Sequence, residues 1–177
     1  MSELLQSPRL QIRRLGMTDL GEIMQVYRDC KEFFLTLVGL TKVSEEYVRD
    51  ELNGVPPNFD SANKYFMGIF LNKTGQMIGV VDFLINYPEP GKGCLGLLLI
   101  RESVQSQGIG REALGIVEKW AHNQGIHEVT LGVELVNKKA YRFWMKNAYL
   151  STGEFFDNST EGRVNRAEGF RKILKYE

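Results

Sequence analysis

The hydrophobic positions follow a helical period near the N-terminus, a strand period in the middle of the chain and an alternation of both towards the C-terminus. In the first part, apolar residues recur at helical spacing at Leu20, Ile23, Met24 and Tyr27. Asp19 and Glu22 just ahead of them have the spacing of a capping box. The pattern therefore predicts a short strand at 10–14, a helix starting near Thr18, an apolar segment at 33–40 broken by Gly39, and a helix from Ser44 to about Gly54.

From residue 64 onward the period changes to that of β-strands. Three segments rich in branched and aromatic residues, at 65–71, 77–85 and 94–100, are separated by turn residues. The four residues Asn72-Lys73-Thr74-Gly75 fit a hairpin turn, and a longer loop spans 87–93. These segments predict an antiparallel meander.

The last third of the chain alternates helices and strands. One face of a helix at 111–124 is defined by Ala113, Leu114, Val117, Trp120 and Ala121. A strand at 128–135, a helix at 137–147 and a closing strand pair at 149–156 and 163–174 follow. No linker, repeat or low-complexity tract interrupts the pattern, so we expect one α/β domain over residues 1–177 with a mixed sheet.

Composition narrows the class of protein without indicating a function. Hydrophobic residues make up 43% and charged residues 25%, and Lys plus Arg equal Asp plus Glu at 22 each, as in an ordinary soluble domain. No basic stripe suggests nucleic acid, and no basic amphipathic or membrane-length apolar segment suggests a membrane. Cys30, Cys94 and the two histidines are scattered, so we expect reduced thiols, a cytoplasmic protein and no metal site.

The most specific local pattern is a polar loop with two glycines, residues 105–110 (Gln-Ser-Gln-Gly-Ile-Gly), between a predicted strand and a predicted helix. Glycines let a backbone come close to an anion, and free N–H groups at a helix start point towards it. Arg111 in the first helical turn opposes the helix dipole, and a bound anion would relieve that conflict. The loop therefore predicts an anion site at residues 107–111.

A second motif follows one strand later, and the two motifs together resemble those of a known family. The residues that carry the two motifs are Gln105, Gly108 and Gly110, then Asn137, Ala140, Phe143 and Trp144. In the order strand, Gln-x-x-Gly-x-Gly, long helix, strand, Asn-x-x-Ala and short aromatic helix, the chain resembles the GNAT superfamily of acyl-CoA-dependent N-acetyltransferases from Leu10 to Leu174. The resemblance implies a single-domain GNAT-like fold with about six or seven mostly antiparallel strands and about four helices.

The resemblance also implies a donor site for acetyl-CoA as co-substrate, without a metal. The pyrophosphate of coenzyme A would lie on the amides of 107–111, and the pantetheine arm would pair with the exposed strand edge in a V-shaped gap before the next strand. Backbone N–H groups near Leu98 and Leu99 would polarise the thioester carbonyl. Asn137 would cap its helix, reach the pantetheine arm, or do both. The expected coenzyme-binding residues are Leu98, Leu99, Ile100, Gln105, Gln107, Gly108, Ile109, Gly110, Arg111, Asn137 and Trp144.

The resemblance to the GNAT superfamily implies that an amine attacks the thioester directly in a ternary complex. A carboxylate or an ordered water would remove a proton from that amine. Glu134 and Asp82 are the two candidate bases, and each also fits a strand residue that simply faces outward. Many family members carry tyrosine where this chain has Trp144, and an indole cannot usefully protonate a departing thiolate. Tyr141, about one helical turn away, is the candidate substitute, although it equally fits a packed aromatic residue.

The sequence does not decide whether the acceptor is a small-molecule amine or a peptide amine. It also does not decide whether the protein forms a homodimer. The resemblance places residues 29–44 over the acceptor, where Asp29 or Glu32 would meet a cation. Phe33, Phe34 and Leu37 would form an apolar wall or, as we prefer, ordinary core.

Two other functions compete with the transferase. Gly108-x-Gly110-x-x-Ala113 also fits a loosened dinucleotide fingerprint, but about seven residues separate Ile100 from Gly108, and a meander precedes them. The second alternative is a sensor or interaction module that has a GNAT-like fold and binds acyl-CoA without transferring the acyl group.

Overall fold

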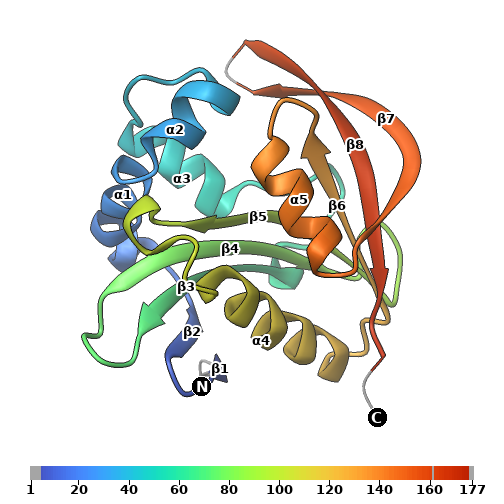
Figure 1. The fold of residues 1–177 in the computed structure, drawn as a ribbon, viewed down its shortest axis with the longest axis horizontal. Coiled ribbons are helices and arrows are strands. Elements are labelled where there is room, and N and C mark those ends of the chain that lie inside the picture. The colour runs from blue at the N-terminus through green and yellow to red at the C-terminus, as the bar shows by residue number, and fades with distance from the viewer. Residues whose placement is uncertain (1–4, 161, 176–177) are drawn as a thin grey trace.

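Within residues 5–160 and 162–175, which the computed structural model describes, eight strands form one sheet in the order β1-β2-β3-β4-β5-β6-β8-β7 (Figure 1). The strands are β1 (Leu5–Gln6), β2 (Leu10–Arg14), β3 (Lys64–Leu71), β4 (Met77–Ile85), β5 (Lys92–Ile100), β6 (Glu128–Glu134), β7 (Leu150–Thr160) and β8 (Arg163–Ile173). All neighbouring strands are antiparallel except β5 and β6, which are parallel. The predicted meander is formed by β3, β4 and β5.

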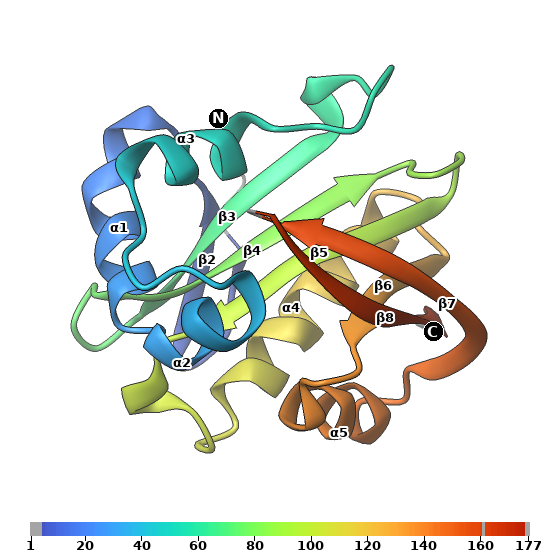
Figure 2. The same ribbon diagram turned by 90° about the horizontal axis from the view of Figure 1, so that it is seen from above.

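Helices cover both faces of the sheet (Figure 2). They are α1 (Leu20–Arg28), α2 (Lys31–Phe33), α3 (Glu45–Asn53), α4 (Ile109–Asn123) and α5 (Lys138–Lys146), with 3₁₀ turns at Met17–Asp19, Ser61–Asn63 and Glu102–Val104 and a π-helix at Phe34–Val38. Residues of α4 and α5 share one core with the sheet, whereas residues of α1, the π-helix and α3 share the core on the other face. All five residues expected on the apolar face of α4 are buried.

The described residues contain more elements than the sequence predicts, namely eight strands and five α-helices. The additional strand is β1, whose two residues are too few to show a strand period. The additional helix is α2, a three-residue turn that runs directly into the π-helix. The first strand of the closing pair is longer than predicted, because β7 stays paired with β8 as far as Thr160 and Arg163.

Two helix starts show where local prediction succeeds and fails. The Ser44 hydroxyl accepts a hydrogen bond from the Tyr47 N–H at 3.0 Å, so α3 begins where expected. The expected Asp19–Glu22 capping box is wrong. Asp19 instead accepts from the Gly16 N–H at 2.9 Å and from Arg13 at 2.8 Å, and so closes a 3₁₀ turn ahead of α1.

The β7–β8 hairpin reaches the helices on the α1–α3 face of the sheet (Figure 1). Asn165 donates to the backbone carbonyl of Leu37 at 2.7 Å, and Arg163 donates to that of Leu35 at 3.3 Å. The hairpin therefore contacts the π-helix that follows α2. Of the helices that the structure describes, none combines the length and the apolar character needed to cross a bilayer.

Candidate active site

The parallel strands β5 and β6 pair only at their first residues. Three partner pairs join them, at Lys92–Glu128, Gly93–Val129 and Cys94–Thr130. Beyond these pairs β5 continues to Ile100 and β6 to Glu134 with no register between them. In the described part of the chain, the edge of β5 from residue 95 to 100 therefore has no strand partner on its β6 side, and this is the strand separation that the resemblance implies.

The register of β5 against β4 determines which backbone groups face this separation. The Arg101 N–H donates to the Ile78 carbonyl at 2.8 Å, and Leu99 lies opposite Val80 in the same register. Because hydrogen bonding alternates along an antiparallel pair, Leu99 bonds towards β4 and the N–H of Leu98 points to the β6 side. The register therefore favours Leu98 over Leu99 as the donor to a thioester carbonyl.

The predicted anion loop joins this strand edge to the start of α4. The amide of Gln105 donates to the Ile100 carbonyl at 2.6 Å and accepts from the ammonium of Lys139, so it ties the end of β5 to α5. Gly108 has φ of 78° and stands at the N-cap of α4, where no side chain caps the helix. The N–H groups of the first turn are thus left for a ligand.

The side chains of the predicted coenzyme loop lie in different environments. Gln107 and Arg111 are exposed, whereas the Ile109 side chain belongs to the core, so only its backbone faces the loop. A Cβ on Gly110 would lie 3.4 Å from the ring of Phe143. A methyl group at this position would therefore make an ordinary van der Waals contact with Phe143, and the anion contact of Gly110 stays a prediction.

On α5, Asn137 accepts from the Ala140 N–H at 3.0 Å, which establishes its capping role and leaves its role towards the pantetheine arm a prediction. Trp144 is 7% exposed and packs between the rings of Phe143 and Tyr149, at centroid distances of 4.9 and 5.0 Å. The structure therefore places the indole in the core.

Tyr141, the candidate proton donor, lies over β8. Its ring stacks edge-on against Phe170 at 5.1 Å, and burial followed by the charge of Glu168 raises the pKa of its phenol. Both partners belong to β8, and β6 separates β8 from the open edge of β5. The structure thus does not bring the Tyr141 hydroxyl to the place where a thioester would lie.

Asp82 and Glu134 lie on the two strands that flank β5, Asp82 on β4 and Glu134 on β6. Asp82 pairs with Leu97 on β5, and extending the β5–β6 register would place Glu134 level with Leu98. Val81 and Phe83 beside Asp82, and Val133 beside Glu134, pack into the α4–α5 core, so both carboxylate side chains project to the α1–α3 face. The structure therefore places both candidate bases on the same face of the sheet.

Each of these carboxylates has one oxygen that is buried and has no hydrogen-bond partner among the described residues, Oδ1 of Asp82 and Oε2 of Glu134. The other oxygen of Asp82 accepts from Lys64 at 2.9 Å, and that of Glu134 accepts from Asn158 at 3.0 Å. Burial raises the pKa of the Asp82 carboxyl, and the ammonium of Lys64 opposes that shift. Asp82 is thus oriented by one partner and retains a free lone pair.

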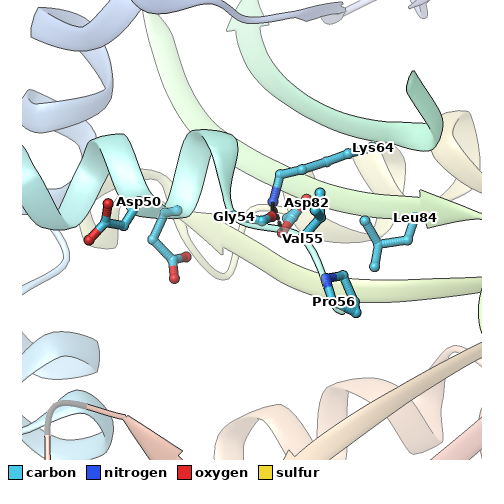
Figure 3. A pocket seen from close by; sticks show the side chains of 8 residues that line it. Asp50, Gly54, Val55, Pro56, Lys64, Asp82 and Leu84 are labelled. Atoms are coloured by element: carbon cyan, nitrogen blue, oxygen red, sulfur yellow. Dashed lines mark hydrogen bonds and ion pairs between the residues drawn. The ribbon is translucent and has the colours of Figure 1, made fainter. Parts of the chain in front are cut away.

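A cavity of about 340 Å³ opens beside Asp82 (Figure 3). It is lined by Asp50, Glu51, Gly54, Val55, Pro56, Lys64, Asp82 and Leu84. Lys64 is 7% exposed on its side chain and also donates to the Gly54 carbonyl at 2.8 Å, which connects β3 to the end of α3. Burial and then repulsion from Asp82 raise the pKa of Glu51. The cavity therefore combines three carboxylates with one ammonium.

Sequence reasoning missed Lys64 and Glu51, because one begins a strand and the other reads as a polar position on a short helix. It also missed Tyr27, whose buried hydroxyl has no hydrogen-bond partner among the described residues. Burial, with the charge of Glu51 next, raises the pKa of that phenol well above its usual value. No spacing in the sequence connects these residues, and only the packing of α1 and α3 on the sheet does.

The segment after α1, which the resemblance places over the acceptor, has its side chains in different environments. One carboxylate oxygen of Asp29 is paired with Arg101 at 2.8 Å, and this ion pair would compete with the expected contact to a cationic acceptor. Phe34 and Leu37 are buried, as the core interpretation predicts, and Phe33 is half-buried. Glu32 is exposed, and its backbone N–H donates to Glu102. No group of three or more His, Cys, Asp or Glu among residues 5–160 and 162–175 is placed to hold a metal ion.

Comparison with known proteins distinguishes the GNAT resemblance from the dinucleotide-binding alternative. Residues 22–149 match the model of the Acetyltransferase (GNAT) family. The chain belongs to this family. The matched region includes both motifs, the open edge of β5 and the two candidate bases, so the candidate site lies within the part of the chain that defines the family. The dinucleotide-binding alternative is therefore dropped.

Solved structures share the GNAT fold over nearly the whole chain. An acetyltransferase from Thermus thermophilus is 24% identical, with a TM-score of 0.71 over 97% of this chain and 100% of that one. The acetyl transferase of Salmonella typhimurium that modifies the N-terminal serine of ribosomal protein L7/L12 is 18% identical, with a TM-score of 0.79 over 98% and 100%. At these identities the likeness shows the fold alone. A search of curated proteins finds no match.

Proposed function

We propose that this GNAT family member transfers an acetyl group from acetyl-CoA to a primary amine of a small molecule or peptide, by direct attack in a ternary complex. The observation that carries the proposal is the open edge of β5, which leads into the uncapped start of α4 and has a buried, unpaired carboxylate oxygen on either side. A donor site and a proton acceptor are thus adjacent.

The backbone of this chain supplies the donor site. The amides at 107–111 suit the charge of the pyrophosphate, and the edge at 98–100 suits the pantetheine arm. The Leu98 N–H then stabilises the oxygen of the thioester carbonyl as negative charge develops on it. Acetyl-CoA supplies the activated acyl group and the leaving thiol.

Asp82 is the base that we favour. Its free oxygen accepts the proton that an ammonium loses before attack, and its raised pKa brings the carboxylate closer to the acidity of that proton. The amine nitrogen bonds to the carbonyl carbon, the carbon–sulfur bond breaks, and the thiolate takes the second proton of the attacking nitrogen. Neither Trp144 nor Tyr141 has to donate a proton in this sequence of steps.

The same residues argue against an acyl-CoA sensor that does not transfer the group. A binding module needs the loop and the strand edge, but it has no use for a buried carboxylate beside the thioester position. A buried carboxylate oxygen without a hydrogen-bond partner, as in Asp82 and Glu134, lowers the stability of the fold. A role in removing a proton from the acceptor amine would explain why such oxygens are present.

A thiol-release assay tests the function. With acetyl-CoA and a panel of primary amines, we expect release of free coenzyme A that depends on the amine and matches the amount of N-acetylated product found by mass spectrometry. Tight binding of acetyl-CoA by calorimetry without turnover of any amine would instead support the sensor.

The acidic cavity predicts a preference for acceptors that carry an additional positive charge. Replacing Glu51 with Gln should raise KM for such an amine about threefold to fivefold and leave kcat unchanged, because the half-buried charge contributes to binding alone. Steady-state kinetics with a charged and a neutral amine measure this difference.

Glu46→Gln is the matched control, since it makes the same charge change on the exposed first turn of α3 and lies outside the cavity. Equal effects of the two variants, or equal effects of Glu51→Gln on both amines, would contradict the acceptor preference.

A further inference from the structure

One cation that belongs to neither sequence motif contacts the predicted coenzyme loop, residues 105–110. Arg9 lies in the turn between β1 and β2, 98 positions before Gln107, and its guanidinium donates to the Gln107 carbonyl at 3.2 Å. Another of its nitrogens lies 3.6 Å from where a Cβ on Gly108 would be. The contact is therefore made to the loop itself, at the residue before the left-handed glycine.

This contact fixes the direction of one N–H group. A trans peptide unit is planar, and its carbonyl and N–H point to opposite sides. When the Gln107 carbonyl is held against Arg9, the Gly108 N–H of the same unit points away from Arg9. Gly108, at φ of 78°, has freedom to turn that an ordinary residue lacks, so an external contact is needed to keep one orientation.

Arg9 is itself held by the first turn of α4. Its Nε donates to Glu112 at 2.6 Å, and the hydroxyl of Ser7 donates to the other Glu112 oxygen at 2.6 Å. Burial acts to raise the pKa of Glu112, but the bonds from Ser7 and Arg9 outweigh it and keep that pKa below its usual value. The planar guanidinium reaches a carboxylate and a carbonyl together, which a lysine ammonium cannot match in geometry.

We infer that Arg9 is a positioning residue for coenzyme binding: clamped by Glu112, it holds the 107–108 peptide unit with its N–H directed to the pyrophosphate. The inference rests on the proposed function. Arg9 acts through the backbone, so it should matter for any donor that contains the pyrophosphate and for none that lacks it.

The test compares Arg9→Gln with three acetyl donors: acetyl-CoA, its analogue without the 3′-phosphate, and acetyl-pantetheine, which has no pyrophosphate. We expect KM to rise about tenfold for the first two donors with kcat unchanged, and kcat/KM for acetyl-pantetheine to stay within about twofold. Calorimetry with coenzyme A should give the same tenfold loss of affinity without an acceptor. Arg13→Gln is the control, because Arg13 pairs with Asp19 away from the loop.

Several results would overturn the inference. An equal loss with acetyl-pantetheine would indicate general damage to the fold, and a loss confined to acetyl-CoA would mean that Arg9 binds the 3′-phosphate directly. Full recovery in Arg9→Lys would show that charge alone is needed. A wild-type protein that binds no coenzyme A would overturn the proposed function itself, whereas a wild type that binds it and an equally tight Arg9→Gln would overturn only the role of Arg9.

Discussion

Replacing Asp82 with Asn should lower kcat at neutral pH by roughly 10²- to 10⁴-fold, the range for loss of a general base. Asn keeps an oxygen that can accept the hydrogen bond from Lys64, so the fold and the cavity should survive the change. It has no lone pair basic enough to take a proton from an ammonium. The substitution therefore removes the chemistry and preserves the geometry, and steady-state kinetics at saturating acetyl-CoA measure the loss.

The pH dependence gives an independent test of the same residue. A base works in its ionised form, so kcat/KM should rise with pH through the pKa of Asp82. Burial raises that pKa, so this acid limb should lie above the usual range of an aspartate carboxyl. In Asp82→Asn the limb should disappear from the residual activity.

Glu134→Gln is the matched comparison, because Glu134, on the other strand that flanks β5, also has a buried oxygen without a hydrogen-bond partner among the described residues. We expect it to lower kcat by less than about tenfold. A larger loss in Glu134→Gln than in Asp82→Asn would reverse the assignment of the base, and an acid limb that persists in Asp82→Asn would argue against Asp82.

Replacing Trp144 with Ala should lower the free energy of unfolding by about 3–5 kcal/mol, the usual cost of deleting a buried aromatic side chain. Trp144 is 7% exposed and contacts the rings of Phe143 and Tyr149, so its truncation would leave a cavity in the core. Urea unfolding, with the midpoint and slope measured together, gives the change in stability.

Met145→Ala is the control on the same helix, since Met145 is 52% exposed, and its effect should stay within about 0.5 kcal/mol. Trp144→Phe, which keeps most of the packing, should bind coenzyme A within about twofold of wild type. A normal stability for Trp144→Ala together with lost affinity for coenzyme A would show instead that the indole is a coenzyme contact.

The fold was predictable wherever a segment is long enough to show its period. The meander and the apolar face of α4 follow from hydrophobic spacing alone. The short elements β1 and α2 carry no period, and the true partners of Asp19 depend on the position of Arg13 on a neighbouring strand.

The residues of the candidate site also fall into those that a local pattern predicts and those that depend on contacts between elements. Contiguous motifs indicated the donor loop, and two strand residues, Asp82 and Glu134, could be nominated as bases. The sequence does not show which residues of separate elements come close together in the folded chain. The Lys64–Asp82 pair, the Glu51 side of the cavity and the contact of Arg9 with the coenzyme loop join residues from separate elements, and only the folded sheet brings them together.

The most direct test of this account is a crystal structure of the protein with acetyl-CoA. We predict that the pyrophosphate contacts the amides at 107–111 and that the thioester oxygen lies about 3 Å from the Leu98 N–H, with the acetyl group facing the cavity beside Asp82. A coenzyme bound away from the β5 edge, or a thioester on the opposite side of the sheet from Asp82, would contradict it.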